Sequence, residues 1–178
     1  KKVDIVINNA GISCTGTADE IDIETFRKVI DINLWGVVYG TRLFLPYLRK
    51  QKEASLVNIS SICGMVPFPE QAPYNMSKSA VLGLNETLMM ELKDTGVQVL
   101  SVHPGTIKTN MVNFGIGQSE QKKSAFEKVA LTTADKAAGQ IVNGIKKKKS
   151  QIFIGIDAKV FQALKRFSPK IALPLIDY

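Results

Sequence analysis

Four short apolar runs constrain the fold of this chain more than any other feature of its sequence. They are rich in valine and isoleucine, with little strict alternation of apolar and polar residues, as is typical of strands buried on both faces. Longer segments of helical character separate them, and this alternation predicts a parallel sheet with helices on both faces. The runs are residues 3–8 (VDIVIN), 55–60 (SLVNIS), 97–102 (VQVLSV) and 151–156 (QIFIGI).

Three long helices are expected between these strands. The first covers about residues 22–50, and Asp22 is a suitable N-cap for it. The second covers about residues 74–95, where Gly96 provides a natural C-terminal stop. The third covers about residues 133–149 and follows the capping signal TTADK.

The composition is that of one ordinary globular domain, which we expect to span residues 1–178. Apolar residues make up 45% and charged residues 22% of the chain, which excludes a disordered or fibrous protein. No apolar run could span a bilayer, and the N-terminal apolar stretch is too short for a signal peptide. Two cysteines fit reduced thiols, and a single histidine without a Cys/His cluster argues against a metal site. These features predict a cytoplasmic protein.

The net charge of +7 raises the question of nucleic acid. Four of the lysines form one run at residues 146–149, however, and no aromatic residues are interleaved with basic ones. The run fits a solvated helix end, where cations also suit the helix dipole. We therefore expect no nucleic-acid partner, whereas an anionic cofactor or substrate could use the positive field.

The least regular part of the sequence is about residues 108–131, which contains Gly115, Gly117 and the polar run 118–124 (QSEQKKS). A long connection in a compact domain is either functional or mobile. Because it leaves the end of a predicted strand, where ligands bind in open α/β sheets, it could form a lid over a pocket. A loosely ordered surface loop is the alternative.

Small and polar residues follow three of the predicted strands. They are 8–11 (NNAG), 59–61 (ISS) and 104–106 (PGT), and Tyr74 and Lys78 begin the helix between two of these strands. Glycines at strand ends let a backbone or a ligand approach closely. Because the carboxyl ends of parallel strands meet at one edge, these clusters converge on one site.

This ordered set resembles the short-chain dehydrogenase/reductase family. Tyr-xxx-Lys alone is a weak motif, but Ser61 lies thirteen residues before Tyr74, which is the family's usual spacing. The resemblance covers residue 1 to about residue 155. It implies a Rossmann-like, doubly wound fold and an oxidoreductase that interconverts a carbonyl and an alcohol with NAD or NADP. The matching residues are 8–11 (NNAG), Asn33, Ser61, Tyr74, Lys78 and 104–109 (PGTIKT).

The resemblance implies that Tyr74 is the general acid and base of the reaction. Lowering a tyrosine pKa by about three units requires roughly 4 kcal/mol of preference for the phenolate. A positive charge at about 4 Å supplies roughly that much at an effective dielectric near 20, and Lys78 lies one helical turn away. Ser61 would hold the carbonyl oxygen of the substrate. Asn33 would hold a water linked to Lys78, at a local distortion of its helix, or would simply bond to backbone.

The family pattern also assigns residues to the cofactor and the substrate. Asn8 is expected to tie neighbouring strands together, and His103 to pack at a strand end. Cys63, beside Ser61 and Tyr74, either faces the substrate or is a small packing residue. The residues implied for cofactor binding are Asn9, Ala10, Gly11, Tyr74, Lys78, Pro104, Gly105, Ile107 and Thr109.

The N-terminal part of the family's pattern is missing. No glycine-rich turn that would cradle a pyrophosphate precedes residue 8, and the strand that selects NAD or NADP is absent. We therefore expect an incomplete doubly wound sheet with an exposed apolar edge strand, belonging to a longer natural protein. The alternative is a truncated or non-catalytic relative that acts as a binding or interaction protein. It would need a lesion in the catalytic set, and Asn33, Ser61, Tyr74 and Lys78 are all present.

Residues 157–178 form an extension that is amphipathic and basic. Val160, Phe161, Leu164 and Phe167 recur at helical spacing beside lysines and an arginine. Such a helix could cover a lipophilic substrate pocket, pack on a partner subunit or, less in keeping with the rest of the sequence, lie on a membrane surface. Family resemblance further implies a homodimer or homotetramer formed through the first two long helices.

Overall fold

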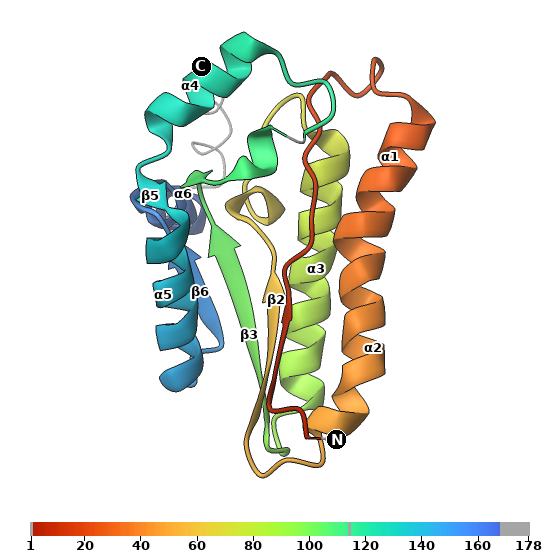
Figure 1. Cartoon of the computed structure of the whole chain (residues 1–178), viewed down its shortest axis with the longest axis vertical. Helices are drawn as coiled ribbons and strands as arrows, with labels where there is room; N and C mark the ends of the chain where they lie inside the picture. The colour runs from red at the N-terminus through yellow and green to blue at the C-terminus, as the bar shows by residue number, and fades with distance from the viewer. Residues whose placement is uncertain (1, 114, 168–178) are drawn as a thin grey trace.

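The structure is a computed structural model that describes residues 2–113 and 115–167. Its centre is a four-stranded parallel sheet with the strand order β1-β2-β3-β6 (Figure 1). The strands are β1 (Ile5–Asn8), β2 (Ala54–Ile59), β3 (Val97–Pro104) and β6 (Gln151–Ile154). The predicted parallel α/β sheet is confirmed, and each predicted strand lies within two residues of an observed one.

Neighbouring residues of the central strands belong to two separate hydrophobic cores. Leu56 of β2 packs in a cluster with Leu48 and Leu88, whereas Val57, the next residue, packs in a cluster with Ala137. Successive side chains of a strand point to opposite faces, so the two clusters lie on opposite sides of the sheet. Helices therefore cover both faces, as the continuous apolar runs predict.

The first long helix is interrupted near its middle. It consists of α1 (Ile23–Ile30), a π-helical turn (Asp31–Trp35) and α2 (Gly36–Leu48). Asp22 caps its start, because its Oδ1 accepts a hydrogen bond from the Thr25 N–H at 2.6 Å. The sequence predicts this cap, whereas a distortion at Asn33 was implied by the family resemblance. Asn33 lies at the centre of the π-helical turn.

The other predicted helices are α3 (Ala72–Glu91), α5 (Ala134–Lys146) and α6 (Ile156–Phe167). Helix α3 ends four residues before the predicted position. A Cβ atom on Gly96 would lie 2.4 Å from the Lys52 carbonyl oxygen, so this glycine serves a close backbone approach after the helix rather than its cap. Residues 168–178, which include most of the predicted C-terminal extension, lie outside the described residues.

The predicted irregular segment 108–131 contains regular structure that the sequence reading missed. Helix α4 (Glu120–Val129) begins within the polar run, where the Ser119 hydroxyl accepts from the Lys122 N–H at 3.3 Å. Strands β4 (Ile107–Lys108) and β5 (Thr132–Thr133) pair in parallel at the two ends of the segment. Helix α4 lies beyond the carboxyl ends of the central strands (Figure 1).

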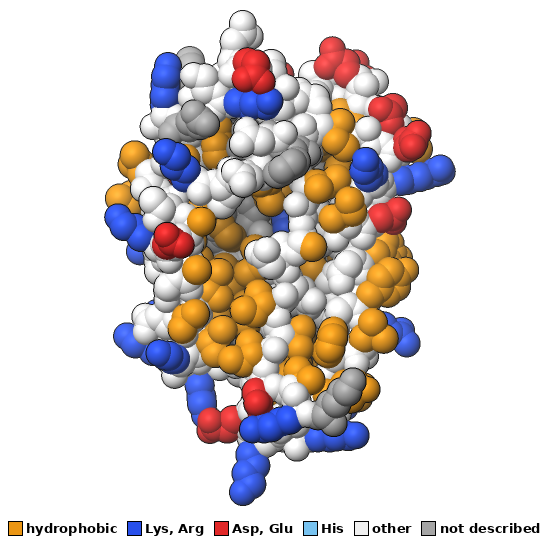
Figure 2. Space-filling model, viewed as in Figure 1, with side chains coloured by type: hydrophobic (Ala, Val, Ile, Leu, Met, Phe, Trp, Pro, Cys, Tyr) orange, Lys and Arg blue, Asp and Glu red, His pale blue; other side chains and the backbone are white. Residues whose placement is uncertain are grey.

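Strand β1 forms an exposed edge of the described sheet. Ile5 and Ile7 are 50% and 48% exposed, and β1 pairs with β2 alone among the described strands. Hydrophobic side chains gather on this face between α5 and the edge (Figure 2). A cavity of about 720 Å³ opens beside the amino ends of the strands, next to Ile5 and Ile145. The predicted apolar edge is therefore confirmed. Among residues 2–113 and 115–167, no helix is both long enough and apolar enough to cross a membrane.

Candidate active site

The start of helix α3 places Tyr74 and Lys78 on one buried face. Pro73 occupies the first turn, where its fixed φ suits a helix and no N–H is needed. The spacing of four residues brings the two side chains onto the same face. Tyr74 is 8% exposed and Lys78 only 2%, so the pair is not a wet surface patch. A buried lysine requires a partner, because burial of an unpaired charge is expensive.

The Lys78 ammonium group joins three parts of the chain. Its Nζ donates to the Ile59 carbonyl oxygen at 2.9 Å, at the end of β2. It lies 5.6 Å from the centre of the Tyr74 ring. A Cβ atom on Gly11 would lie 3.4 Å from Nζ, so the segment after β1 passes close to the ammonium. The structure thus brings the predicted residues Gly11, Tyr74 and Lys78 together at the carboxyl edge of the sheet.

Asn33 is fully buried, and its side-chain amide forms hydrogen bonds with other groups of the protein. Its Oδ1 accepts from the Ile12 N–H at 2.8 Å, and its Nδ2 donates to the Ile12 carbonyl oxygen at 2.9 Å. Nδ2 also donates to the Ser77 hydroxyl at 3.1 Å. This pairing with the backbone is the structural alternative that the sequence left open for Asn33. It fixes the chain after β1 against α3.

Ser61 follows β2 and caps a short 3₁₀ helix (Ile62–Gly64). Its Oγ accepts from the Cys63 N–H at 3.1 Å and lies 3.5 Å from the Pro104 carbonyl oxygen. A Cβ atom on Gly64 would lie 2.6 Å from the Lys78 carbonyl oxygen, so only glycine lets this turn rest against α3. Ser61 is thereby held beside the helix that carries Tyr74.

The pKa values of the pair are shifted by their burial. Burial raises the pKa of Tyr74, the nearby Cys63 adds to that rise, and a hydrogen bond from the Ser61 side chain opposes it. Burial also lowers the pKa of Lys78 to about 8. The predicted lowering of the Tyr74 pKa is therefore wrong for the protein side chains taken alone. Any lowering requires positive charge in addition to that of Lys78.

Cys63 has the contacts of a small packing residue, one of the two interpretations offered for it. It packs against the cluster of Ile62, Val66 and Ala158, and its side chain is half-buried. Burial raises the pKa of its thiol, while the Ser61 hydrogen bond and the charge of Lys78 lower it. The thiol therefore lies beside the Tyr74–Lys78 pair as a neutral group of small volume.

The remaining residues predicted for cofactor binding lie around the same edge. Asn9 and Ala10 are exposed after β1. Pro104 and Gly105 are half-buried at the end of β3, and the Thr109 hydroxyl accepts from the Met111 N–H at 3.4 Å. The side chain of Ile107, in contrast, packs in the core beneath α5, so only its backbone could contact a ligand. Asn8 bonds to Asn58 at 2.7 Å and ties β1 to β2 as predicted.

Three residues that support the site were given no role from the sequence. The Ser77 hydroxyl donates to the Tyr74 carbonyl oxygen at 2.7 Å, and the Ser60 hydroxyl donates to the Lys78 carbonyl oxygen at 2.8 Å. The Asp157 carboxylate accepts from the Thr106 N–H at 2.5 Å. Ser77 and Ser60 directly precede Lys78 and Ser61, so their positions in the sequence could have indicated a supporting role. Asp157 is far in sequence from Thr106, so no local pattern could have indicated its role.

A parallel sheet between two helical layers, with polar residues gathered at its carboxyl edge, defines a Rossmann-like α/β protein. Residues 1–121 match the family model described as short chain dehydrogenase. Because the match covers more than half of the chain, this protein belongs to the short-chain dehydrogenase/reductase family.

Individual relatives agree with this assignment. A Mycobacterium tuberculosis protein named "Putative oxidoreductase SadH" is 37% identical over 168 residues, which cover 90% of this chain and 61% of that protein. A trans-4-hydroxycyclohexanecarboxylate dehydrogenase of Sinomonas cyclohexanicum is 39% identical over 119 residues, covering 65% of this chain and 46% of the relative. The chain thus spans about three fifths or less of the length of these two relatives.

Solved structures show the same fold. A short-chain dehydrogenase from Streptomyces avermitilis matches with a TM-score of 0.81 and 28% identity, over 97% of this chain and 68% of that one. A short-chain dehydrogenase/reductase from Burkholderia phymatum, solved in complex with NAD, matches with a TM-score of 0.83 and 23% identity, over 96% and 67% of the two chains. The second likeness concerns the fold alone.

Proposed function

We propose that this protein carries the catalytic part of an NAD- or NADP-dependent oxidoreductase that interconverts a carbonyl and an alcohol. The observation that carries the proposal is the burial of Tyr74 and Lys78 side by side, with Ser61 held against the same helix. A phenol and an ammonium buried next to each other are suited to proton transfer, unlike a pair on the surface. The proposal concerns the whole protein, of which this chain matches about three fifths in its relatives.

The residues present fit a nicotinamide cofactor at this edge. Gly11 leaves open space that a Cβ atom would take, 3.2 Å from Asn33 and 3.4 Å from the Lys78 ammonium. Gly11, Lys78 and the backbone from Pro104 to Thr109 would hold the cofactor, with Asn9 and Ala10 lining its path. When bound, the nicotinamide supplies or accepts the hydride.

The side chains then divide the proton chemistry among them. The Ser61 hydroxyl donates a hydrogen bond to the carbonyl oxygen of the substrate, and the Tyr74 hydroxyl gives that oxygen its proton during reduction. In the reverse direction Tyr74 accepts the proton. The Lys78 ammonium would favour the phenolate form of Tyr74 by its charge and would bond to the ribose hydroxyls of the cofactor.

The amide side chain of Asn33 has no hydrogen left to donate to the water proposed beside Lys78. Both amide hydrogens and one lone pair of that side chain are already bonded to Ile12 and Ser77, so only the second lone pair of Oδ1 remains. A π-helical turn changes which carbonyl groups find partners within a helix. We therefore assign the proposed water site to the main chain of the turn at residues 31–35.

An apolar wall beside the site favours a lipophilic substrate. The Phe161 ring of α6 lies edge-on to Phe68, with 5.5 Å between ring centres. Both contact the cluster of Ile62, Val66 and Ala158, which adjoins Ser61 along the chain. The packing of α6 against this cluster supports the proposal that the helix lines a lipophilic substrate pocket.

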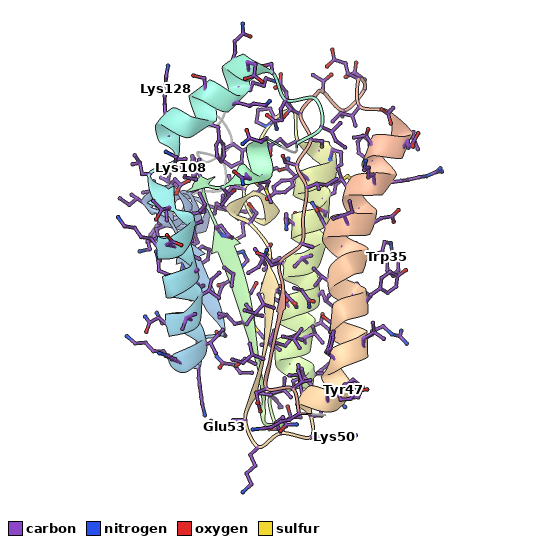
Figure 3. The ribbon with its side chains drawn as sticks, in the orientation of Figure 1. Trp35, Tyr47, Lys50, Glu53, Lys108 and Lys128 are labelled. Atoms are coloured by element: carbon purple, nitrogen blue, oxygen red, sulfur yellow. The ribbon has the colours of Figure 1, made fainter. Side chains whose placement is uncertain are left out.

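A homo-oligomer is proposed through the outer face of the first long helix. Trp35, Tyr39, Leu43 and Tyr47 follow one another at intervals of four residues and are between 43% and 67% exposed. Trp35 and Tyr47 point away from the body of the molecule (Figure 3). An exposed stripe of aromatic residues is typical of a protein interface, and a second copy of this chain is the proposed partner.

The test uses the whole protein and both reduced cofactors. Binding of NADH or NADPH should enhance the cofactor's fluorescence, and Tyr74→Phe should keep that binding while lowering turnover by about 10²- to 10⁴-fold. Tyr47→Phe, at an exposed tyrosine, is the matched control and should leave turnover unchanged. Retained turnover in Tyr74→Phe would overturn the mechanism. Failure to bind either cofactor would favour a non-catalytic binding protein.

A further inference from the structure

A chain of buried polar side chains crosses the sheet behind the site. Each member is a side chain of the sheet or of α3, and each link is a hydrogen bond between 2.6 and 2.9 Å. Asn58, Asn85, Ser101 and His103 are all fully buried. The links run from Asn8 Nδ2 to Asn58 Oδ1, from Asn58 Nδ2 to Asn85 Oδ1, from Asn85 Nδ2 to Ser101 Oγ, and from Ser101 Oγ to His103 Nε2.

The chain ends on the backbone of Ser61. The Nδ1 atom of His103 lies 3.3 Å from the Ser61 carbonyl oxygen. The same ring stacks on Phe153, with 5.1 Å between ring centres. His103 is the only histidine of the chain, and the proton chemistry assigned to Tyr74 does not use it.

The direction of these hydrogen bonds fixes the proton on the ring. The Gln151 amide nitrogen, which can only donate, lies 3.0 Å from His103 Nε2, so Nε2 is the acceptor of this bond. The Ser101 hydroxyl accepts from Asn85 and lies 2.9 Å from the same Nε2. Its one hydrogen is available for a bond to Nε2, which agrees with that assignment. The single proton of the neutral ring is then on Nδ1, where it faces the Ser61 carbonyl oxygen.

We propose that His103, held as the Nδ1–H tautomer, is a positioning residue for Ser61. Its Nδ1–H donates to the Ser61 carbonyl oxygen and fixes the peptide plane that follows this residue. That plane begins the 3₁₀ helix whose Cys63 N–H donates to the Ser61 hydroxyl, so it sets the direction of Oγ. The kinetic part of this inference rests on the proposed function, because it assumes that Ser61 holds the substrate carbonyl.

The neutral state of the ring agrees with its surroundings. Burial lowers the pKa of His103 to about 4, while the hydrogen bond to the Ser61 backbone opposes that shift. The side chains bonded to the ring, Ser101 and Gln151, carry no charge, and the ring that stacks on it is that of Phe153. A packing role alone would not require a particular tautomer, whereas positioning through Nδ1 does.

The first experiment is nitrogen-15 NMR of histidine-labelled whole protein at pH 7, with the His103 signals assigned by their loss in His103→Gln. We expect a protonated Nδ1 and an unprotonated Nε2, unchanged on titration down to about pH 5. A protonated Nε2, in either the other tautomer or the imidazolium, would overturn the proposal. This measurement does not depend on enzymatic activity. The only variant that has to fold is His103→Gln, which is used to assign the signals.

The second experiment compares two substitutions of the ring. His103→Gln keeps an amide donor, whereas His103→Met has similar bulk and no donor. We expect His103→Met to lower kcat about tenfold with the dissociation constant of NADPH or NADH changed less than twofold, and His103→Gln to recover most of the loss. Thr41→Val, a buried hydroxyl at the Asn8 end of the chain of bonds, is the control and should match the wild type.

If His103→Met, His103→Gln and Thr41→Val all have the same kcat, His103 does not position Ser61, even if its tautomer is as assigned. If the wild-type protein turns over no substrate, the proposed function fails independently. Positioning is then decided by the carbon-13 shift of the Ser61 carbonyl group. It should move in His103→Met and stay near the wild-type value in His103→Gln, and a shift unmoved in both would refute the proposal.

Discussion

The Nζ atom of Lys78 lies 5.6 Å from the centre of the Tyr74 ring and 2.9 Å from the Ile59 carbonyl oxygen. The ammonium thus faces the tyrosine ring and is anchored to the end of β2. Its charge is buried beside one neutral hydrogen-bond acceptor, and this explains why burial dominates the shift of its pKa. The buried ammonium therefore lowers the free energy of unfolding, and this effect can be measured.

This effect predicts a pH dependence in the alkaline range. The pKa of Lys78 falls from 10.5 to about 8 in the folded protein. Between these values the unfolded chain binds a proton that the folded chain does not, so stability rises with pH. Relative to Lys78→Met, the free energy of unfolding should rise by up to about 3 kcal/mol from pH 8 to 10.5.

Urea denaturation of both proteins at several pH values measures this difference. Lys50→Met is the matched control, because Lys50 is exposed and its Nζ lies over the Tyr47 ring at 5.9 Å. A difference between the wild type and Lys78→Met that stays constant over this pH window would show that the ammonium is not destabilised by burial.

Two glycines on or against α3 should respond oppositely to alanine. A Cβ atom on Gly64 would lie 2.6 Å from the Lys78 carbonyl oxygen, so Gly64→Ala should destabilise the protein by about 1–3 kcal/mol and lower activity. Gly83, within α3, has no atom within 4 Å of such a Cβ. Gly83→Ala should therefore stabilise by up to about 1 kcal/mol. Thermal unfolding of both variants checks the pair, and equal effects would contradict the close contact.

Asp157 should act on the cofactor through the loop it holds. Its carboxylate accepts from the Thr106 N–H, and a Cβ atom on Gly105 would lie 2.3 Å from that carboxylate. Asp157→Ala should weaken binding of NADH or NADPH about tenfold by freeing this loop. Asp157→Asn keeps an oxygen acceptor and should bind nearly as the wild type does. Fluorescence titration measures both, and equal losses in the two variants would point to charge rather than to the hydrogen bond.

The exposed stripe of Trp35, Tyr39, Leu43 and Tyr47 should be needed for association. Leu43 is 67% exposed at the centre of the stripe, and a buried carboxylate in an interface is strongly unfavourable. Leu43→Glu should reduce the particle mass measured by light scattering to that of one chain. Val142→Glu, on α5 with 47% exposure, is the control and should leave the mass unchanged. A wild type that is already monomeric would remove the basis for this interface.

The parallel sheet and the convergence of the site could be predicted because they depend on local patterns. Continuous apolar runs indicate strands that are buried on both faces of the sheet, and the carboxyl ends of parallel strands meet at one edge. Tyr74 and Lys78 meet because they lie one helical turn apart. Asn33 was expected at a distortion through family resemblance, and the π-helical turn is observed there.

What the sequence left open depends on contacts between distant residues. Helix α4 was missed because its ten residues include few apolar ones, so no core-facing stripe marks it. Strands β4 and β5 have two residues each, which is too short for any periodicity to be visible. The predicted direction of the Tyr74 pKa shift was wrong because burial outweighs the opposing hydrogen bond from the Ser61 side chain.

The π-helical turn at Asp31–Trp35 makes the first long helix one residue longer than its span requires. Because its hydrogen bonds join residues five apart instead of four, the turn takes up this extra residue within itself. Deleting one residue there would let an ordinary turn form, and the segments on either side would keep nearly the same faces. Val29, fully buried in α1, would then still face the core. A deletion within the regular part of α2, in contrast, would rotate one side of the helix by about 100° against the other. The π-helical turn is therefore the place where this helix can lose a residue without changing which side chains meet the core.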